Sequence, residues 1–259
     1  MNTLLFASLI VFVYMSVFFL IAVARKDNSL ADVAWGGGFI LVALATFFRA
    51  PGEAEARQVL ATGLVIVWGV RLAVHIYFRN RGKAEDFRYA KWRRDWGKYF
   101  LLRSYLQVFL LQGALLVVIV WSVIFINMYP TRGLSVLDAL GLLVWTTGFF
   151  FEAVGDYQLL RFTRDPANKG RVMNTGLWRY TRHPNYFGEA TMWWGVFLMA
   201  LPLEGGYAAL VSPLTITFLL LKVSGIPMLE KKLMETQEGY AEYARRTNAF
   251  VPWFPRELK

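Results

Sequence analysis

The sequence predicts an all-α membrane protein with seven transmembrane helices, its N-terminus outside and its C-terminus in the cytoplasm. Apolar residues make up 56% of the 259-residue chain, whereas soluble domains contain about 45–50%. These residues gather in blocks long enough to cross a hydrocarbon core about 30 Å thick. Because a backbone in lipid must satisfy its own hydrogen bonds, the blocks are expected to form helices.

The first apolar block has neither a basic start nor a small-residue cleavage site, so we interpret it as a span and not as a signal peptide. Only residues 203–206 separate the last two blocks, which predicts an antiparallel hairpin. The tail 229–259 alternates apolar and charged residues and is expected to form a short amphipathic helix folded back on the cytoplasmic face. The predicted spans are residues 3–24, 30–48, 58–78, 105–128, 135–160, 186–203 and 206–228.

The distribution of basic residues sets the predicted orientation. The connections after spans one, three, five and seven contain 23 of the 28 Lys and Arg residues. An odd number of spans places all four of these segments on one face, which the positive-inside bias assigns to the cytoplasm. This bias also explains the net charge of +10 without nucleic-acid binding.

Composition excludes several kinds of chemistry. The chain has no cysteine, so disulfides, thiolate nucleophiles and cysteine-ligated metals are ruled out. Its two histidines, His75 and His183, are too few to hold a metal ion without carboxylates, and we expect no metal site.

Ionisable side chains within membrane spans are costly and indicate functional sites. We expect five of them, contributed by four spans, to meet in a polar pocket in the cytoplasmic third of the membrane. The alternative is a set of separate structural pairs, such as Asp32 with Arg71. The five residues expected in the pocket are Asp32, His75, Arg79, Asp156 and Glu189.

The basic segment 161–189 is typical of an anion site. Its arginines offer paired donors that match phosphate oxygens, and Asn185 can cap the sixth span, whose N-terminus favours an anion. We favour a nucleotide-type ligand over lipid headgroups, because lipid binding does not need Asn, Gly and carboxylates at fixed places. The chain contains no Walker motif and no Gly-x-Gly-x-x-Gly. We interpret Gly36-Gly37-Gly38 as a site of close helix packing.

The run GLWRYTRHPNYFGE at residues 176–189, followed by Trp193-Trp194-Gly195, resembles the C-terminal region of the steroid 5α-reductase superfamily. It is closest to that superfamily's bacterial DUF1295 branch. The similarity extends back to Arg71-Leu72, Arg79 and residues 85–89, and forward to the Val-Pro-Trp-Phe-Pro end at 251–255.

The resemblance implies an NADPH-dependent reductase of the C=C bond of an α,β-unsaturated ketone, such as a 3-oxo-Δ4-steroid or a similar flat enone. It implies one membrane domain over 1–259, with substrate-side helices in 1–128 and the cofactor-binding region in 129–259. The implied NADPH contacts are Arg79, Asp86, Arg88, Tyr89, Asp156, Arg161, Arg164, Asn168, Arg171, Asn174, Tyr180, Arg182, His183, Asn185, Tyr186, Glu189, Trp193 and Tyr240.

Catalysis in this family needs an acid that polarises the ketone oxygen while hydride reaches the β-carbon. The eukaryotic enzymes use a Gln-Glu pair on the second helix and a Tyr on the third. Here the second span carries Asp32 and no such pair, so we predict Asp32 as the carboxylate counterpart. His75 or Tyr77 is then the predicted donor to the ketone oxygen.

Two other functions remain open. The Arg-His-Pro-Asn-Tyr core and the Tyr- and Glu-rich tail also resemble isoprenylcysteine carboxyl methyltransferases, which bind S-adenosylmethionine with this region. A non-enzymatic lipid- or sterol-binding membrane protein is the third possibility. The reductase is favoured because its extra arginines suit the 2′-phosphate of NADPH, which the methyl donor lacks. We expect the protein in a bacterial inner membrane with the cofactor site facing the cytoplasm, and the sequence leaves its oligomeric state open.

Overall fold

The computed structural model describes residues 1–129, 131 and 133–257. The described part of the chain is helical and contains no strand. Six of its helices are long and apolar enough to cross a membrane, which identifies the chain as an integral membrane protein. They are Thr3–Arg25, Leu30–Arg49, Ala56–Asn80, Phe87–Ile119, Val136–Arg164 and Gly206–Thr236.

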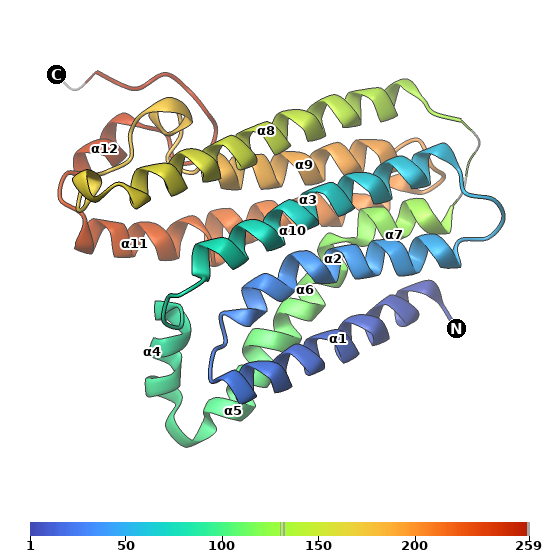
Figure 1. Cartoon of the computed structure of the whole chain (residues 1–259). Coiled ribbons are helices and arrows are strands. Elements are labelled where there is room, and N and C mark those ends of the chain that lie inside the picture. Colours follow the sequence, from blue (N-terminus) through green and yellow to red (C-terminus); the bar gives the residue numbers. More distant parts are fainter. Residues whose placement is uncertain (130, 132, 258–259) are drawn as a thin grey trace. The chain divides into compact units, whose positions relative to one another are not determined.

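The helices form two compact units, and Figure 1 shows the path of the chain through each. Unit 1 contains residues 1–135 and 199–211, and unit 2 contains residues 136–198 and 212–259. The elements of unit 1 are α1 (Thr3–Arg25), α2 (Leu30–Arg49), α3 (Ala56–Asn80), α4 (Phe87–Trp96), η1 (Gly97–Tyr99), α5 (Phe100–Arg103), η2 (Ser104–Leu110), α6 (Leu111–Ile119), α7 (Trp121–Met128) and η5 (Gly206–Leu210).

Close packing of α2 on α3 organises unit 1. A Cβ added to Gly36 would lie 2.8 Å from the backbone oxygen of Gly69, and one added to Gly69 would lie 2.9 Å from that of Gly36. Neighbouring Gly38 would meet Leu116 on α6 at 2.5 Å. These approaches confirm the predicted packing role of the glycine run, because any side chain would force the helices apart.

The predicted span at 105–128 is not one regular helix. Its first part is the π-helix η2, followed by α6, and the chain continues into α7 after a break at Val120. A π-turn adds a residue to the helix and changes which face each following side chain occupies. The apolar block predicted the segment, but its composition carried no signal for this irregularity.

Unit 2 is built around the long helix α8. The predicted span at 135–160 forms α8, which continues to Arg164, and the predicted span at 186–203 forms α9, which has 17 residues. The elements of unit 2 are α8 (Val136–Arg164), η3 (Pro166–Asn168), η4 (Gly176–Arg179), α9 (Pro184–Ala200), α10 (Val211–Phe218), η6 (Leu219–Val223), α11 (Ile226–Thr236) and α12 (Tyr240–Arg246).

Glycines at seven-residue spacing bring α8 and α9 into backbone contact. A Cβ on Gly148 would lie 2.5 Å from the backbone oxygen of Gly188, and a Cβ on Gly195 would lie 2.6 Å from that of Gly141. Seven residues make about two helical turns, so such glycines share one face. This contact fixes the polar residues at the ends of the two helices relative to one another.

The tail forms two helices where one was predicted. Helix α11 continues from the preceding membrane helix, and α12 follows after Gly239, whose φ of +80° turns the chain. The final segment then returns to the loop before α9, where the amide of Trp253 donates to the backbone oxygen of Tyr180 at 2.9 Å. Glycine adopts this left-handed conformation without steric cost.

Candidate functional site

The first polar contact of unit 2 joins α8 to the start of α9. Asn185 Nδ2 donates to Asp156 Oδ1 at 3.1 Å, and Asn185 Oδ1 accepts from the Tyr186 amide at 3.0 Å. The prediction that Asn185 caps this helix is wrong, because the helix begins at Pro184 and Asn185 lies in its first turn. Proline suits the first helical position because its φ is already helical.

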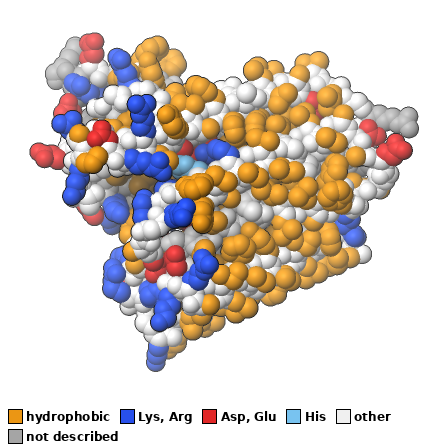
Figure 2. Space-filling model, in the orientation of Figure 1, with side chains coloured by type: hydrophobic (Ala, Val, Ile, Leu, Met, Phe, Trp, Pro, Cys, Tyr) orange, Lys and Arg blue, Asp and Glu red, His pale blue; other side chains and the backbone are white. Residues whose placement is uncertain are grey.

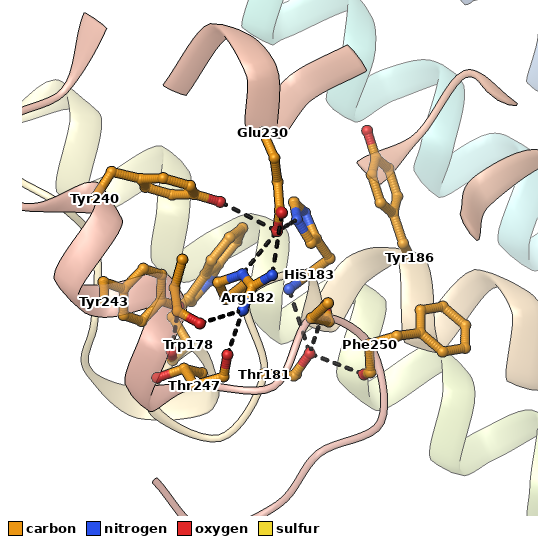
Figure 3. A network of polar contacts seen from close by, with 12 residues as sticks. Trp178, Thr181, Arg182, His183, Tyr186, Glu230, Tyr240, Tyr243, Thr247 and Phe250 are labelled. Atoms are coloured by element: carbon orange, nitrogen blue, oxygen red, sulfur yellow. Dashed lines mark hydrogen bonds and ion pairs between the residues drawn. The ribbon is translucent and has the colours of Figure 1, made fainter. Parts of the chain in front are cut away.

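A partly buried ion pair holds the loop before α9 to α11. Arg182 Nε donates to Glu230 Oε1 at 2.7 Å, and its Nη2 donates to Glu230 Oε2 at 3.0 Å (Figure 3). The remaining guanidinium nitrogen donates to the backbone oxygens of Ala244 and Thr247. A bidentate pair of this kind is both strong and directional. Glu230 therefore neutralises Arg182 within the protein.

His183 joins the same carboxylate. Its Nε2 lies 2.9 Å from Glu230 Oε1, its ring stacks on Tyr186, and its side chain is 1% exposed. Burial, together with the charge of Arg182, lowers the pKa of His183 although Glu230 acts in the opposite direction. The ring is therefore neutral near pH 7, and its Nδ1 has no hydrogen-bond partner among the described residues.

Two tyrosines of α12 complete this cluster. The hydroxyl of Tyr240 lies 3.4 Å from Glu230 Oε1, and that of Tyr243 donates to the Trp178 backbone oxygen at 2.5 Å. Burial raises the pKa of both hydroxyls above its ordinary value, so both remain protonated donors. We call Arg182, His183, Glu230 and Tyr240 the latch.

The latch is extended by backbone contacts to the C-terminal segment. Thr181 Oγ1 donates to the backbone oxygen of Phe250 at 2.8 Å, and the amide of Arg182 donates to that of Asn248 at 2.9 Å. Thr181 is fully buried. The loop that leads into α9 is thus fixed on both sides.

An open groove of about 510 Å³ lies between the C-terminal half of α8 and the loop that follows it. Gln158 organises one wall, because its Oε1 accepts from the Leu177 amide at 3.0 Å. Asn168 organises the other, since its Nδ2 donates to the Phe162 backbone oxygen at 3.1 Å. The groove is lined by Val154, Tyr157, Gln158, Arg161, Phe162, Asp165, Asn168, Met173, Thr175 and Gly176.

Exposed cations lie in and near this groove. The acid among the lining residues, Asp165, accepts a hydrogen bond from the Ala167 amide at 2.9 Å. Among the residues that the structure describes, none forms a salt bridge with these cations. Uncompensated guanidinium groups beside polar side chains are suited to a phosphate-bearing ligand. The cations are Arg161, Arg164, Lys169, Arg171 and Arg179.

Unit 1 contains a second polar cluster, at the start of α2. Asp32 Oδ2 accepts from Arg88 Nη2 at 2.7 Å, and Asp32 Oδ1 accepts from the Tyr89 hydroxyl at 2.6 Å. Asp86 caps α4 through the Arg88 amide and also binds the Arg88 guanidinium at 2.9 Å. Four residues predicted to act in the site thus contact one another, although three were predicted as cofactor contacts and one as catalytic.

A further layer fixes this cluster to the connection between α1 and α2. Glu85 accepts from Arg93 Nη2 at 2.7 Å and from the Asn28 amide at 2.8 Å. Asn28 in turn donates to Ser104 Oγ at 2.7 Å. The basic loop after α3 is therefore partly neutralised by its own acids, and α4 is held against α2.

The other predicted residues of α3 lie on different sides of the helix. Consecutive residues are separated by about 100° around a helix, so His75 and Tyr77 diverge by about 200°. Tyr77 is 53% exposed and Arg79 is exposed, whereas His75 is half-buried. Burial alone would raise the pKa of the Asp86 carboxyl, but its contacts with Arg88 and the charge of Arg79 lower this pKa below its ordinary value.

The remaining predicted cofactor residues of unit 2 occupy three environments. Asn174 and Tyr180 are exposed on the loop, and the Tyr180 ring packs edge-on against Phe254 at 6.0 Å. Glu189 is half-buried in α9, and Trp193 is 2% exposed. The polar pocket predicted from Asp32, His75, Arg79, Asp156 and Glu189 draws on both units and stays a prediction.

Sequence reasoning missed several residues that organise these clusters. Glu230 is the most important, because the tail offers four further acids after it and the sequence does not show which of them faces Arg182. Arg182 and the adjacent His183, directly before a helix, were the available signal for a buried acid partner. Gln158 and Gln112, whose Nε2 lies 3.4 Å from the Tyr89 hydroxyl, carried no comparable signal.

Comparison with known proteins supports the family but assigns no activity. The model of the family described as "Protein of unknown function (DUF1295)" matches residues 18–247. "Uncharacterized protein C594.04c" of Schizosaccharomyces pombe is 26% identical over 223 residues, which cover 76% of this chain and 64% of the relative. The chain thus spans less than two thirds of that relative's length. No solved structure matches the chain.

Proposed function

The chain belongs to the DUF1295 family, and from this premise we propose that it is an NADPH-dependent reductase of the C=C bond of an α,β-unsaturated ketone. The family match confirms the DUF1295 part of the resemblance described above. The wider similarity to steroid 5α-reductases supplies the proposed reaction. A flat hydrophobic enone, such as a 3-oxo-Δ4-steroid, is the proposed substrate class.

One observation carries this proposal: the groove along α8 combines an uncompensated guanidinium, amide side chains and aromatic rings. Arg161 lines it and forms no salt bridge with a described residue, while Tyr157 and Phe162 supply ring surfaces. A dinucleotide phosphate needs donors such as guanidinium groups, and its bases need flat apolar surfaces. A volume of about 510 Å³ is within the range of small-molecule sites.

The donor set of unit 2 fits NADPH chemically. Arg161, Arg164 and Arg171 are exposed and can each bind a phosphate oxygen pair, and Asn174 can reach a ribose or base edge as donor or acceptor. When bound, NADPH would supply the hydride. The latch residues have another task in this proposal, because their donors are already bound to Glu230 and to backbone oxygens.

We assign the latch a positioning role. Arg182 and His183 lie directly before α9, and their contacts with Glu230 fix the loop that links the groove to this helix. Tyr186 is in turn held by stacking on His183. A fixed loop reduces the ordering cost of binding a long, flexible ligand.

In unit 1, Asp32 is better suited to orienting a proton donor than to donating a proton itself. Both of its carboxyl oxygens accept hydrogen bonds, one from Arg88 and one from the Tyr89 hydroxyl, and neither is seen to donate one. Of the two donors predicted for the ketone oxygen, His75 is half-buried and Tyr77 is on the exposed side of α3. We therefore propose His75 as the donor and Asp32 as the carboxylate of the substrate end.

The proposed topology has seven spans, with α9 as the short seventh. Its 17 residues are at the lower limit of the length that crosses a bilayer. With seven spans the basic connections lie on one face, so the positive-inside bias places the groove and the C-terminus in the cytoplasm. NADPH is available on that side. The proposed location is a bacterial inner membrane with the cofactor site on its cytoplasmic side.

Ligand-dependent stability tests the proposal directly. Purified protein in detergent is heated with NADPH, with NADH and with S-adenosylmethionine. A ligand that binds only the folded state stabilises it by about 2.7 kcal/mol at a hundredfold excess over its dissociation constant, so we expect a clear rise in the midpoint with NADPH. Oxidation of NADPH at 340 nm with an enone then reports turnover.

The three ligands separate the alternatives. Stabilisation by S-adenosylmethionine alone would contradict the reductase and favour a methyltransferase. A response to none of them would contradict both enzymes and favour a lipid- or sterol-binding protein. A variant in which Arg161 and Arg171 are both replaced by neutral residues provides the control for the cofactor site. Its midpoint of thermal unfolding should no longer rise with NADPH, whereas its midpoint without ligand should be unchanged.

A further inference from the structure

Helices α1 and α6 enclose an apolar groove of about 350 Å³ on the surface of unit 1. It is formed where small side chains of one helix face large side chains of the other. Gly113 lets α1 pack closely against its floor, since a Cβ there would lie only 3.0 Å from Val11 and 3.1 Å from Met15. The groove is lined by Ser8, Val11, Phe12, Met15, Leu110, Gly113, Ala114 and Val117.

The groove follows directly on the π-helix η2. Leu110 is the last residue of η2 and one of the groove's lining residues. The extra residue in a π-turn shifts the following side chains around the helix axis, and such turns are frequent at binding sites. After this turn Gly113 faces Val11 and Met15 of α1, and Ala114 also lines the groove.

The register of the two helices locates what lies beyond the groove. Ser16 Oγ and the Tyr105 hydroxyl are 2.9 Å apart, and Val11 and Met15 face Gly113, so α1 and η2–α6 run antiparallel. The same register brings the end of α1 to the level of η1 and α5. Arg93 Nη2, on α4, donates to the Lys26 backbone oxygen at 3.2 Å. This contact also places the end of α1 beside the segment that contains α4, η1 and α5.

Four cations gather at this end, and none forms a salt bridge with a described residue. Two acids of this end already accept hydrogen bonds, Asp27 from the Ser29 amide at 2.9 Å and Glu85 from Arg93 and the Asn28 amide. In Figure 2 Lys and Arg side chains crowd the end where Figure 1 shows α4, and hydrophobic side chains cover most of the length of the helices. The four cations are Arg25, Lys26, Lys98 and Arg103.

The spacing between cations and groove matches a phospholipid. Arg25 lies ten residues after Met15, which is about 15 Å along a helix axis. An acyl chain covers half of a hydrocarbon core about 30 Å thick, which is also about 15 Å. Met15 is the groove residue of α1 nearest to Arg25, and Leu110 lies seven residues after Arg103. An acyl chain whose phosphate is bound by these cations therefore reaches the near end of the groove, lined by Met15 and Leu110.

We propose that unit 1 binds one anionic glycerophospholipid, with its phosphate at Arg25, Lys26, Lys98 and Arg103 and an acyl chain in the α1–α6 groove. Each cation near a membrane surface contributes about 1 kcal/mol toward anionic lipid, which corresponds to about a fivefold change in affinity. The apolar lining of the groove matches the acyl chain. This site is independent of the proposed cofactor groove, because all its residues belong to unit 1.

Native mass spectrometry of the purified protein tests the site. Dioleoylphosphatidylglycerol and dioleoylphosphatidylcholine are added in turn, and the lipid-bound fraction is measured. We expect preferential retention of phosphatidylglycerol. Arg25→Gln with Arg103→Gln should weaken it about 30-fold, and Ala114→Phe should abolish it by filling the groove. If Ala114→Phe does not fold, Ala114→Leu replaces it.

Two matched variants complete the design. Lys83→Gln with Arg94→Gln removes two exposed cations of the same basic loop, and Val13→Phe adds a ring at a position on α1 that is 58% exposed and outside the groove. Both should retain the lipid. Equal binding of the two lipids, or equal loss in all charge variants, would overturn the proposal. So would a dimer that dissociates on Ala114→Phe, because the groove would then hold a second copy of the chain.

Discussion

Glu230 and Arg182 form a bidentate pair, with Nε–Oε1 at 2.7 Å and Nη2–Oε2 at 3.0 Å. The two residues are 48 positions apart in the sequence, so the pair joins the tail to the loop before α9. Both side chains are largely buried, since that of Arg182 is 11% exposed and that of Glu230 is 17% exposed. The cost of their burial is offset only while both partners are present.

Glu230→Gln should therefore destabilise the protein more than an ordinary surface change. Loss of the carboxylate leaves Arg182 buried without a counter-ion, a defect that costs about 3–5 kcal/mol in a fully buried site and about 2–3 kcal/mol at this partial exposure. The midpoint of thermal unfolding in detergent measures this loss of stability. Glu238→Gln, at an exposed position of the same tail, should change the midpoint little. Equal effects of the two substitutions would contradict a structural latch.

The latch also makes stability depend on pH. Burial lowers the pKa of His183 below the ordinary value near 6.5, so the unfolded chain binds this proton at a higher pH than the folded protein. Stability is then complete above about pH 6.5 and is lost as the pH falls toward the folded pKa, by at most about 1.4 kcal/mol per pH unit. Thermal midpoints between pH 8 and pH 5 measure the loss.

The two histidines provide their own control for this pH effect. His183→Gln should flatten the decline below pH 6.5, whereas His75→Gln should leave the contribution of His183 in place. A decline that is unchanged in His183→Gln would show that another group titrates.

The close contact of α8 and α9 predicts that alanine substitutions at two glycines will affect stability very differently. Gly148→Ala should destabilise unit 2, because its Cβ would lie 2.5 Å from the Gly188 backbone oxygen and 2.7 Å from the Met192 amide nitrogen. Gly63 has no atom within 4 Å of an added Cβ, so Gly63→Ala should be neutral or stabilise α3 by up to about 1 kcal/mol. Thermal unfolding of both variants checks the contrast, and equal midpoints would contradict close packing.

These contacts show how far the sequence could predict the fold. Apolar blocks and basic loops predicted the helices, because the length of a span and the side on which charges lie are local properties. The division of residues 105–128 into η2, α6 and α7 was missed, since a π-turn has no apolar signature. The second tail helix was missed because only residues 237–239 separate α11 from α12, with the turn made at Gly239.

The candidate site was predictable as a set of residues but not as a set of partners. Asp32, Asp86, Arg88 and Tyr89 were all selected from the sequence, yet their mutual hydrogen bonds depend on how α4 packs against α2. Glu230 was not selected, because any acid of the tail could have paired with Arg182. Residue type predicts chemistry, whereas pairing over 48 positions requires the fold.

Asp32→Asn tests the role proposed for the substrate end. The amide keeps an acceptor for Tyr89 but loses the charge that balances Arg88, whose remaining carboxylate partner in the described chain is Asp86. We expect turnover of an enone to fall while the NADPH-dependent rise in thermal midpoint is retained. Unchanged turnover would mean that Asp32 is only structural. Asp95→Asn, at an exposed position of α4, is the matched control.

Arg171→Ala tests which nucleotide the exposed cations select. Arg171 is exposed and forms no salt bridge with a described residue, so its removal should not disturb the fold. If it binds the 2′-phosphate, the lost charged hydrogen bond is worth about 1.5–3 kcal/mol, or about a 10- to 150-fold loss of NADPH affinity, whereas NADH affinity should change little. Titrations of both nucleotides by thermal shift measure the ratio. Equal losses for NADPH and NADH would place Arg171 at the pyrophosphate or at no specific contact, and Lys169→Ala, also exposed on this loop, shows how much of any effect is general electrostatic attraction.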